Sequence, residues 1–139
     1  MRRLLITGVL TAATFVAVVI PASASFDSHF AVISETIQSH ETDDGFRFRD
    51  HLFQIDNPSN RIGRDHGGCA QRSHRKFKCK VLVHLNGEVG GFGDLRINGN
   101  FGRGDNRLNV TGGTGDFAGV GGKVVLSQRT TVFTFSLVD

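Results

Sequence analysis

Hydrophobic and polar residues alternate along most of the chain beyond residue 25, which is the pattern of half-buried strands. In residues 77–85 the odd positions are apolar and most even ones are basic, and residues 95–101 and 133–137 alternate in the same way. Residues 29–38 and 46–55 read as two longer strands, separated by the turn-rich segment 40–45. No window shows the spacing of an amphipathic helix. The pattern predicts an all-β domain of roughly seven or eight strands, either a sandwich or a closed barrel.

The glycine content of the chain favours a closed barrel over a sandwich. Thirteen of the thirty-six residues from 87 to 122 are glycine, and many lie in stretches that otherwise read as strand. Glycine inside a strand marks a bulge, a tight bend or a crowded interior, and a small sheet needs strong coiling in order to close on itself. Apolar residues interrupt the run at intervals, which argues against a flexible linker.

The segment 110–126, VTGGTGDFAGVGGKVVL, raises the alternative of a nucleotide-binding loop. Gly113, Gly115 and Ala118 have the G-x-G-x-x-G/A spacing of dinucleotide sites. Such a site needs a helix directly after the glycines, whereas this chain continues with more glycines and then Val124 and Val125. We therefore expect a turn and bent strands here.

The first 24 residues have the features of a signal peptide. Arg2 and Arg3 precede an apolar run over residues 4–20, and Ala22-Ser23-Ala24 forms a small-residue cleavage site. A retained membrane anchor is the alternative, because the apolar run reaches the lower limit for a membrane span. We expect cleavage and a secreted single domain of residues 25–139.

Loss of the leader changes the charge balance. The whole chain has 16 Lys and Arg and 13 Asp and Glu, but residues 25–139 have 14 and 13, a formal charge of +1. This balance gives little support to a nucleic-acid partner.

The two cysteines, Cys69 and Cys79, are most simply paired in a disulfide if the chain is exported. The alternative is a zinc site made by His66, Cys69, His74 and Cys79, although that spacing matches no common zinc pattern. We expect no metal and no cofactor.

Together with VFTFSLVD at residues 132–139, the 110–126 segment resembles the C-terminal glycine-rich motif of the allene oxide cyclase and dirigent superfamily. The resemblance extends through RDHLFQIDNPSNRIGRDHGGC at residues 49–69 and LRINGNF at residues 95–101, and so covers most of residues 46–138. It implies a closed eight-stranded antiparallel barrel with an apolar central pocket, often trimeric. Family members cyclise a reactive fatty-acid epoxide or steer the coupling of phenoxy radicals, mainly by holding a reactive molecule in one shape.

The resemblance also points to catalytic residues. Asp50 lies where the family's second strand carries an acid, and in this sequence it shares a face with Phe48 and Leu52. A carboxylate on an apolar face is suited to acid–base work, although a structural acid paired with an arginine remains the alternative. Glu35 loosely resembles the pocket glutamate of the cyclases. The expected pocket residues are Phe46, Phe48, Ile97, Phe101 and Phe133.

Two departures count against a transferred activity: the chain has no tyrosine, and Gly121 stands where the family has Tyr or Arg. The sequence therefore favours a secreted barrel that binds a small apolar or phenolic molecule and directs its cyclisation or isomerisation. A non-catalytic extracellular binding or interaction protein on the same barrel is the alternative.

A basic cluster, RSHRKFKCK at residues 72–80, is either a solvated hairpin or a contact for an anionic surface. The absence of Tyr and Trp removes the stacking half of a nucleic-acid site, so no nucleic-acid partner is expected. Its basic residues are Arg72, Arg75, Lys76, Lys78 and Lys80.

Overall fold

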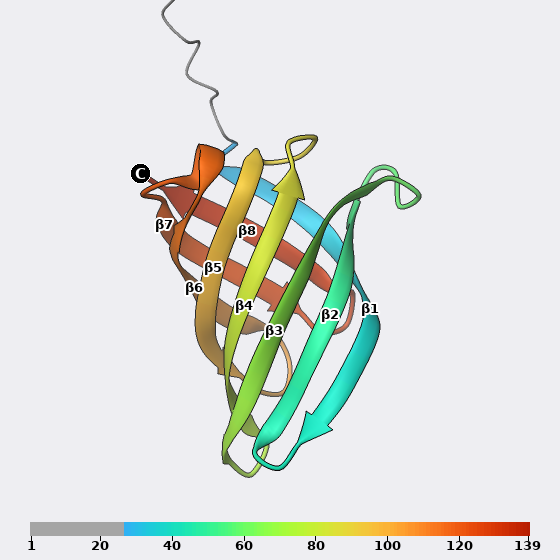
Figure 1. The fold of residues 1–139 in the computed structure, drawn as a ribbon, viewed down its shortest axis with the longest axis vertical. Helices are drawn as coiled ribbons and strands as arrows, with labels where there is room; N and C mark the ends of the chain where they lie inside the picture. Colours follow the sequence, from blue (N-terminus) through green and yellow to red (C-terminus); the bar gives the residue numbers. More distant parts are fainter. Residues whose placement is uncertain (1–26) are drawn as a thin grey trace, which may run out of the picture.

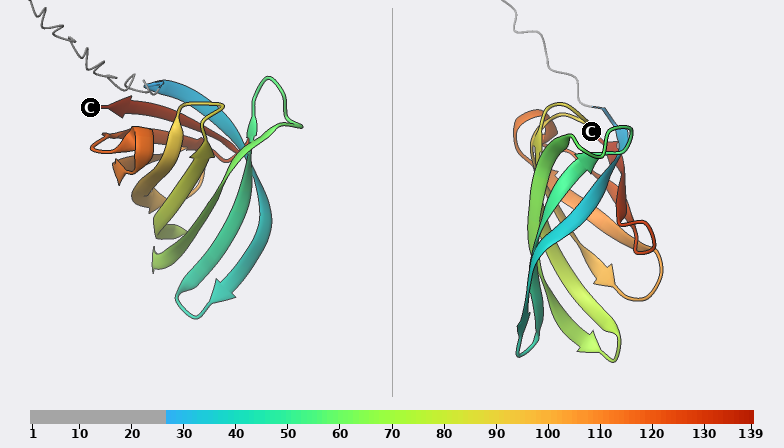
Figure 2. Two further views of the ribbon diagram at one scale, coloured as in Figure 1. Left: turned by 45° about the horizontal axis from the view of Figure 1, so that its top comes forward. Right: turned by 90° about the vertical axis from the view of Figure 1, so that its right-hand side faces the viewer.

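The computed structural model describes residues 27–139, so the predicted signal peptide lies outside the described residues. Eight strands pair in chain order, each antiparallel to the next, and β8 pairs with β1 to close the sheet (Figure 1). Figure 2 shows β1 and β8 side by side where the barrel closes. The predicted all-β class and the closed eight-stranded antiparallel barrel are confirmed. No helix within the described range is long and apolar enough to cross a membrane.

The strands span most of the described chain. They are β1 (His29–Thr42), β2 (Gly45–Gln54), β3 (Arg61–Ser73), β4 (Lys76–Asn86), β5 (Phe92–Phe101), β6 (Asn106–Gly113), β7 (Gly121–Ser127) and β8 (Val132–Val138).

The alternation seen in the sequence sets which side chains enter the barrel. In β4, Val81, Val83 and Leu85 are buried, while the three lysines that precede them are exposed and the residues between them are half-buried. At the end of the barrel where the described chain begins and ends, aromatic rings fill the interior. Phe30 and Phe135 stack with their ring centroids 4.6 Å apart, and Phe117 lies against Phe30 at 6.4 Å.

The glycine-rich segment forms turns and bent strands. Between β6 and β7 it makes one turn of 3-10 helix, η1 (Gly115–Phe117), and no α-helix follows the glycines. Gly122 in β7 has φ +131°, and a Cβ at this position would collide with the carbonyl oxygen of Ser136 on β8. Here glycine allows β7 to lie close against its neighbour as the sheet curls.

Candidate functional site

A cavity of about 420 Å³ opens inside the barrel at the end away from the termini. Its lining comes from the parts of the strands next to the β1–β2, β3–β4, β5–β6 and β7–β8 turns. In Figure 1 these turns lie below the end of the barrel that carries η1. The volume is within the range typical of small-molecule sites. The interior therefore consists of a filled half and a hollow half.

One wall of the cavity is aromatic. Phe46 and Phe48 come from β2, Phe101 from the end of β5 and Phe133 from the start of β8. Phe46 and Phe48 lie next to each other with ring centroids 6.1 Å apart. These four of the five pocket residues expected from the sequence do line the cavity.

The wall formed by β1, which lies between β2 and β8 in the closed sheet, is polar. Ser34, Thr36 and Ser39 line the cavity. In a regular strand one residue separates successive inward side chains, but two residues separate Thr36 from Ser39. The register of β1 against β2 shifts between Thr36 and Gln38, which is the mark of a β-bulge. The extra residue, Ile37, is 53% exposed, and the bulge returns Ser39 to the inner face opposite Phe48.

Asp50 on β2 joins the two walls. Its side chain lines the cavity beside Phe48 and is only 6% exposed. The hydroxyl of Ser34 donates a hydrogen bond of 2.8 Å to Asp50 Oδ2, while Oδ1 has no hydrogen-bond partner. No arginine or lysine among the described residues forms a salt bridge with this carboxyl. Asp50 is therefore not the arginine-paired structural acid that was the alternative.

Asp65 on β3 is a site residue that the sequence analysis missed. It lies directly opposite Asp50 in the β2–β3 register and is 2% exposed, and no side chain other than that of Asp50 interacts with its carboxyl oxygens. Burial, and then the neighbouring charge of Asp50, raises the pKa of Asp65 to about 8. At neutral pH this carboxyl is therefore mostly protonated, next to a second acid at the cavity wall.

Two expected site residues lie elsewhere. Glu35 is exposed on the outer face of β1, opposite His51, because Val32 and Ser34 rather than Ile33 and Glu35 face inward. Ile97 is buried in the core of the barrel but does not line the cavity.

Cys69 and Cys79 form a disulfide between β3 and β4, and both line the cavity. Their pairing contradicts the zinc alternative, because neither sulfur remains as a free thiolate. Within residues 27–139 no group of three or more His, Cys, Asp or Glu side chains could hold a metal ion.

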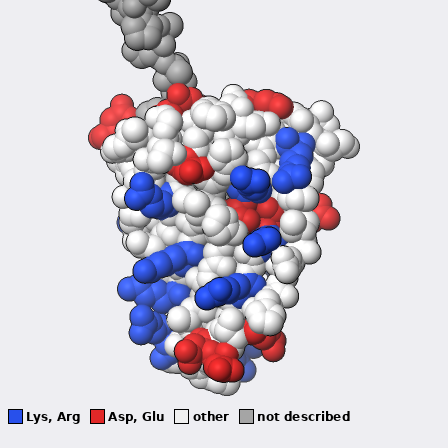
Figure 3. Space-filling view, viewed as in Figure 1, with Lys and Arg blue, Asp and Glu red and all other residues white. Residues whose placement is uncertain are grey.

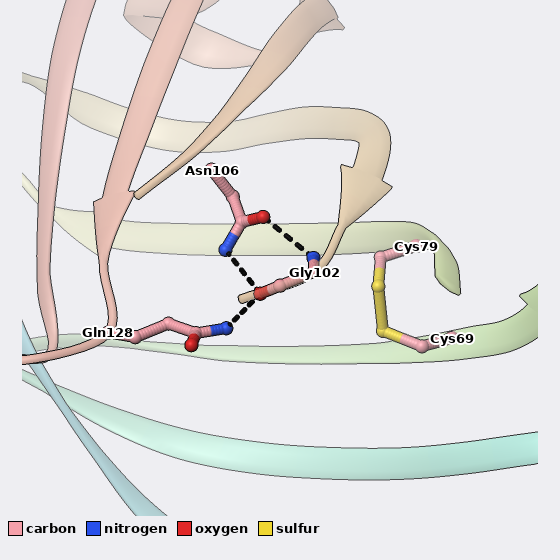
Figure 4. The surroundings of a disulfide bond; sticks show 5 residues. All are labelled: Cys69, Cys79, Gly102, Asn106 and Gln128. Carbon is pink, nitrogen blue, oxygen red and sulfur yellow. Dashed lines mark hydrogen bonds between the residues drawn. A yellow bond between two sulfur atoms is a disulfide. The ribbon is translucent and has the colours of Figure 1, made fainter. Parts of the chain in front are cut away.

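The β5–β6 turn near the disulfide is held by side chains (Figure 4). Asn106, which is buried, accepts a hydrogen bond of 2.7 Å from the Gly102 amide and donates to the Gly102 and Gly104 carbonyl oxygens. Gln128 donates a second hydrogen bond of 2.5 Å to the Gly102 carbonyl oxygen. These contacts fix the rim of the cavity across two turns.

No protein-family model matches the chain, and no curated protein sequence matches it either. Among solved structures, the fold is similar to that of a protein described as pyocyanin demethylase. The TM-score is 0.64 at 18% sequence identity, and the similarity covers 79% of this chain and 99% of the other. A likeness at this level of identity concerns the fold, and the similar chain is covered almost from end to end.

Proposed function

We propose that this chain is a secreted barrel that binds a small apolar or aromatic molecule in its cavity and directs the cyclisation or isomerisation of that molecule. The observation that carries the proposal is the cavity itself, whose lining combines four aromatic rings, the hydroxyl groups of β1 and the Asp50 carboxyl. Such a site suits a ligand with an apolar body and one polar edge. The disulfide is compatible with an extracellular location.

The proposed chemistry needs no oxidant or reductant. In an isomerisation one proton leaves the ligand and returns to a different atom, so the composition of the ligand does not change. Asp50 Oδ1, which has no partner, is the atom we assign to this proton transfer. Asp65 would act through Asp50, holding a proton next to it while the aromatic wall restricts the ligand to one shape.

Family membership is part of the proposal. The glycine-rich motif at residues 110–126 and the eight-stranded barrel together support a place among the allene oxide cyclase and dirigent proteins. The name of the similar structure, pyocyanin demethylase, describes an enzyme that modifies a small molecule, which supports the same kind of use for the cavity. The trimer implied by the family resemblance belongs to this proposal as well.

A second candidate is a non-catalytic extracellular binding protein on the same barrel. The absence of any tyrosine and the Gly121 replacement favour it, because the family's polar pocket groups at those positions are missing. The aromatic cavity would then hold its ligand without changing it.

Native mass spectrometry of protein purified from its own secretions tests the binding proposal. We expect a retained small molecule, an intact disulfide and an oligomer, and a cavity without any ligand under these conditions would contradict binding. The compound released from the protein then serves as the probe for variants.

Asp50→Asn separates the two candidates, with Asp56→Asn in the exposed β2–β3 turn as the matched control. If the barrel is catalytic, Asp50→Asn should lose conversion of the probe by roughly a factor of 10²–10⁴, as expected for a general acid or base, while the control converts it normally. If the variant and the wild type bind and convert the probe equally, Asp50 has no catalytic role.

A further inference from the structure

The basic residues of this chain are concentrated on one outer face of the barrel. The strands β2 to β5 carry nine Lys and Arg side chains, all of them exposed. Figure 3 shows such side chains spread over this face, with a dense group at its lower left. The nine are Arg47, Arg49, Arg61, Arg64, Arg72, Lys76, Lys78, Lys80 and Arg96.

Acidic residues of the same four strands do not neutralise this face. Asp50 and Asp65 point into the barrel and are buried. Asp94 lies 2.6 Å from Nδ1 of His84, and no Lys or Arg within residues 27–139 forms a salt bridge with a carboxylate. The basic face therefore remains unpaired even though residues 25–139 are close to neutral as a whole.

At its centre the face is hollowed into an open groove of about 610 Å³. Gly68 forms part of the floor, with Arg47 beside it on β2 and Lys80 on β4. In the next row of paired residues, Leu82 on β4 lies between His66 on β3 and Arg96 on β5. Cations two strands apart are separated by about 10 Å, so several charged groups of one extended chain could be contacted at once.

From this arrangement we propose that the outer face of β2 to β5 binds an anionic polysaccharide, with the Gly68 groove as its central contact. Charge complementarity supplies the attraction. Asn98 and Thr111 add neutral polar side chains to the same groove, which suits the hydroxyl groups of a sugar chain.

The composition of the groove favours this partner over a membrane or a nucleic acid. The apolar residues that line the groove are Val81, Leu82 and Ile97, of which Val81 and Ile97 are buried and Leu82 is half-buried. None is a large exposed side chain of the kind that inserts into a lipid surface. No Phe, Tyr or Trp lines it, so the large aromatic stacking platforms of single-stranded nucleic-acid sites are missing.

Retention of the full, disulfide-intact protein on immobilised heparin, a sulfated polysaccharide, tests the proposal. We expect salt-dependent retention that free heparin abolishes and neutral dextran leaves unchanged. The triple variant Arg47→Glu/Lys80→Glu/Arg96→Glu should bind heparin more weakly by roughly a factor of ten or more, since three surface charges are reversed.

The matched control is Arg103→Glu/Arg107→Glu/Arg129→Glu, which changes the net charge equally at exposed positions outside β2 to β5. It should keep heparin affinity within a factor of about three, because the charges that it reverses are off the proposed face. Thermal unfolding of each variant verifies that the barrel is intact.

Three results would overturn the proposal: no heparin retention by the wild type at low ionic strength, an equal loss in both triple variants, or equally tight binding of duplex DNA or of anionic lipid vesicles through the same three residues. The last result would assign the face to a different partner. None of these outcomes depends on what the interior cavity binds.

Discussion

Asp50 and Asp65 lie directly opposite each other on β2 and β3, both on the inner face of the barrel and both almost inaccessible to solvent. Two acids placed in this way cannot easily both be ionised, because the charge on one carboxylate raises the free energy of ionising the other in a desolvated site. The pair holds a proton at neutral pH through Asp65. The barrel interior thus keeps a protonated carboxyl group beside the cavity.

The raised pKa of Asp65 predicts how stability depends on pH. The unfolded chain releases this proton near pH 3.8 and the folded chain near pH 8, so the folded state binds more protons between these values. Stability from this residue is then fully present below about pH 4 and falls as the pH rises towards 8, by at most about 1.4 kcal/mol per pH unit. Asp65→Asn, which cannot ionise, should flatten the curve.

Urea unfolding of the wild type and Asp65→Asn from pH 5 to pH 8 measures this difference. The variant should gain stability relative to the wild type as the pH rises. A constant difference across the range would show that Asp65 has an ordinary pKa in the folded protein.

The neighbouring glycines of β3 should respond differently to the same substitution. A Cβ at Gly67 would lie 2.6 Å from the Lys80 carbonyl oxygen and 2.8 Å from the Phe48 ring, whereas a Cβ at Gly68 meets nothing closer than 3.7 Å. Gly67→Ala should therefore destabilise the barrel by about 1–3 kcal/mol, as overpacking does. Gly68→Ala should change stability by less than about 0.5 kcal/mol, which is usual for a surface position. Denaturant midpoints measure both effects, and equal effects would contradict the close contact of Gly67 with Phe48 and Lys80 and the open surroundings of Gly68.

Removal of the disulfide should weaken the barrel without abolishing its topology. The bond closes a loop with a sequence separation of ten residues, for which chain entropy gives a stabilisation of about 2–3 kcal/mol. The double variant Cys69→Ala/Cys79→Ala should lose about this much in chemical unfolding and behave like the reduced wild type. Labelling of denatured, unreduced wild-type protein with an alkylating reagent should find no free thiol, and two labelled thiols would disprove the bond.

Asn106→Ala should loosen the rim of the cavity. The substitution leaves the Gly102 amide and the carbonyl oxygens of Gly102 and Gly104 without their Asn106 partner, at a cost of about 1–3 kcal/mol. Asn100→Ala, at an exposed position of β5, is the matched control and should be nearly neutral. Hydrogen exchange of the Gly102 amide provides a local measurement, and unchanged protection in Asn106→Ala would contradict the role assigned to this side chain.

The strands were predictable from the sequence where alternation is clean. In β4 and β8 apolar residues occupy every second position, and the structure places them inside. In β1 the run from Phe30 to Ile33 is apolar throughout, so the pattern does not fix which face is inside, and Glu35, expected in the pocket, is exposed on the outer face. The bulge after Thr36 then shifts the inward and outward alternation by one residue, and the sequence has no glycine or proline there to indicate it.

Asp65 was missed for a related reason. It lies between Arg64 and His66, and the glycines around it remove the apolar neighbours that would mark an inward face. Its inward direction becomes visible only through the pairing with Asp50, which depends on strand register. A signal was nevertheless present in the sequence, since both acids stand in the same Arg-Asp-His triplet, at residues 49–51 and 64–66.

That repeated triplet also bears on how faithfully the chain can assemble. Slipping β2 or β3 by a single position would turn an arginine and a histidine inward and leave the acid outside, because successive side chains point to opposite sides. Misaligned pairings of this hairpin would thus enclose cations among phenylalanines, at a heavy desolvation cost. The two Arg-Asp-His triplets, which place acids inside the barrel and basic residues outside it, therefore also disfavour shifted registers of β2 against β3.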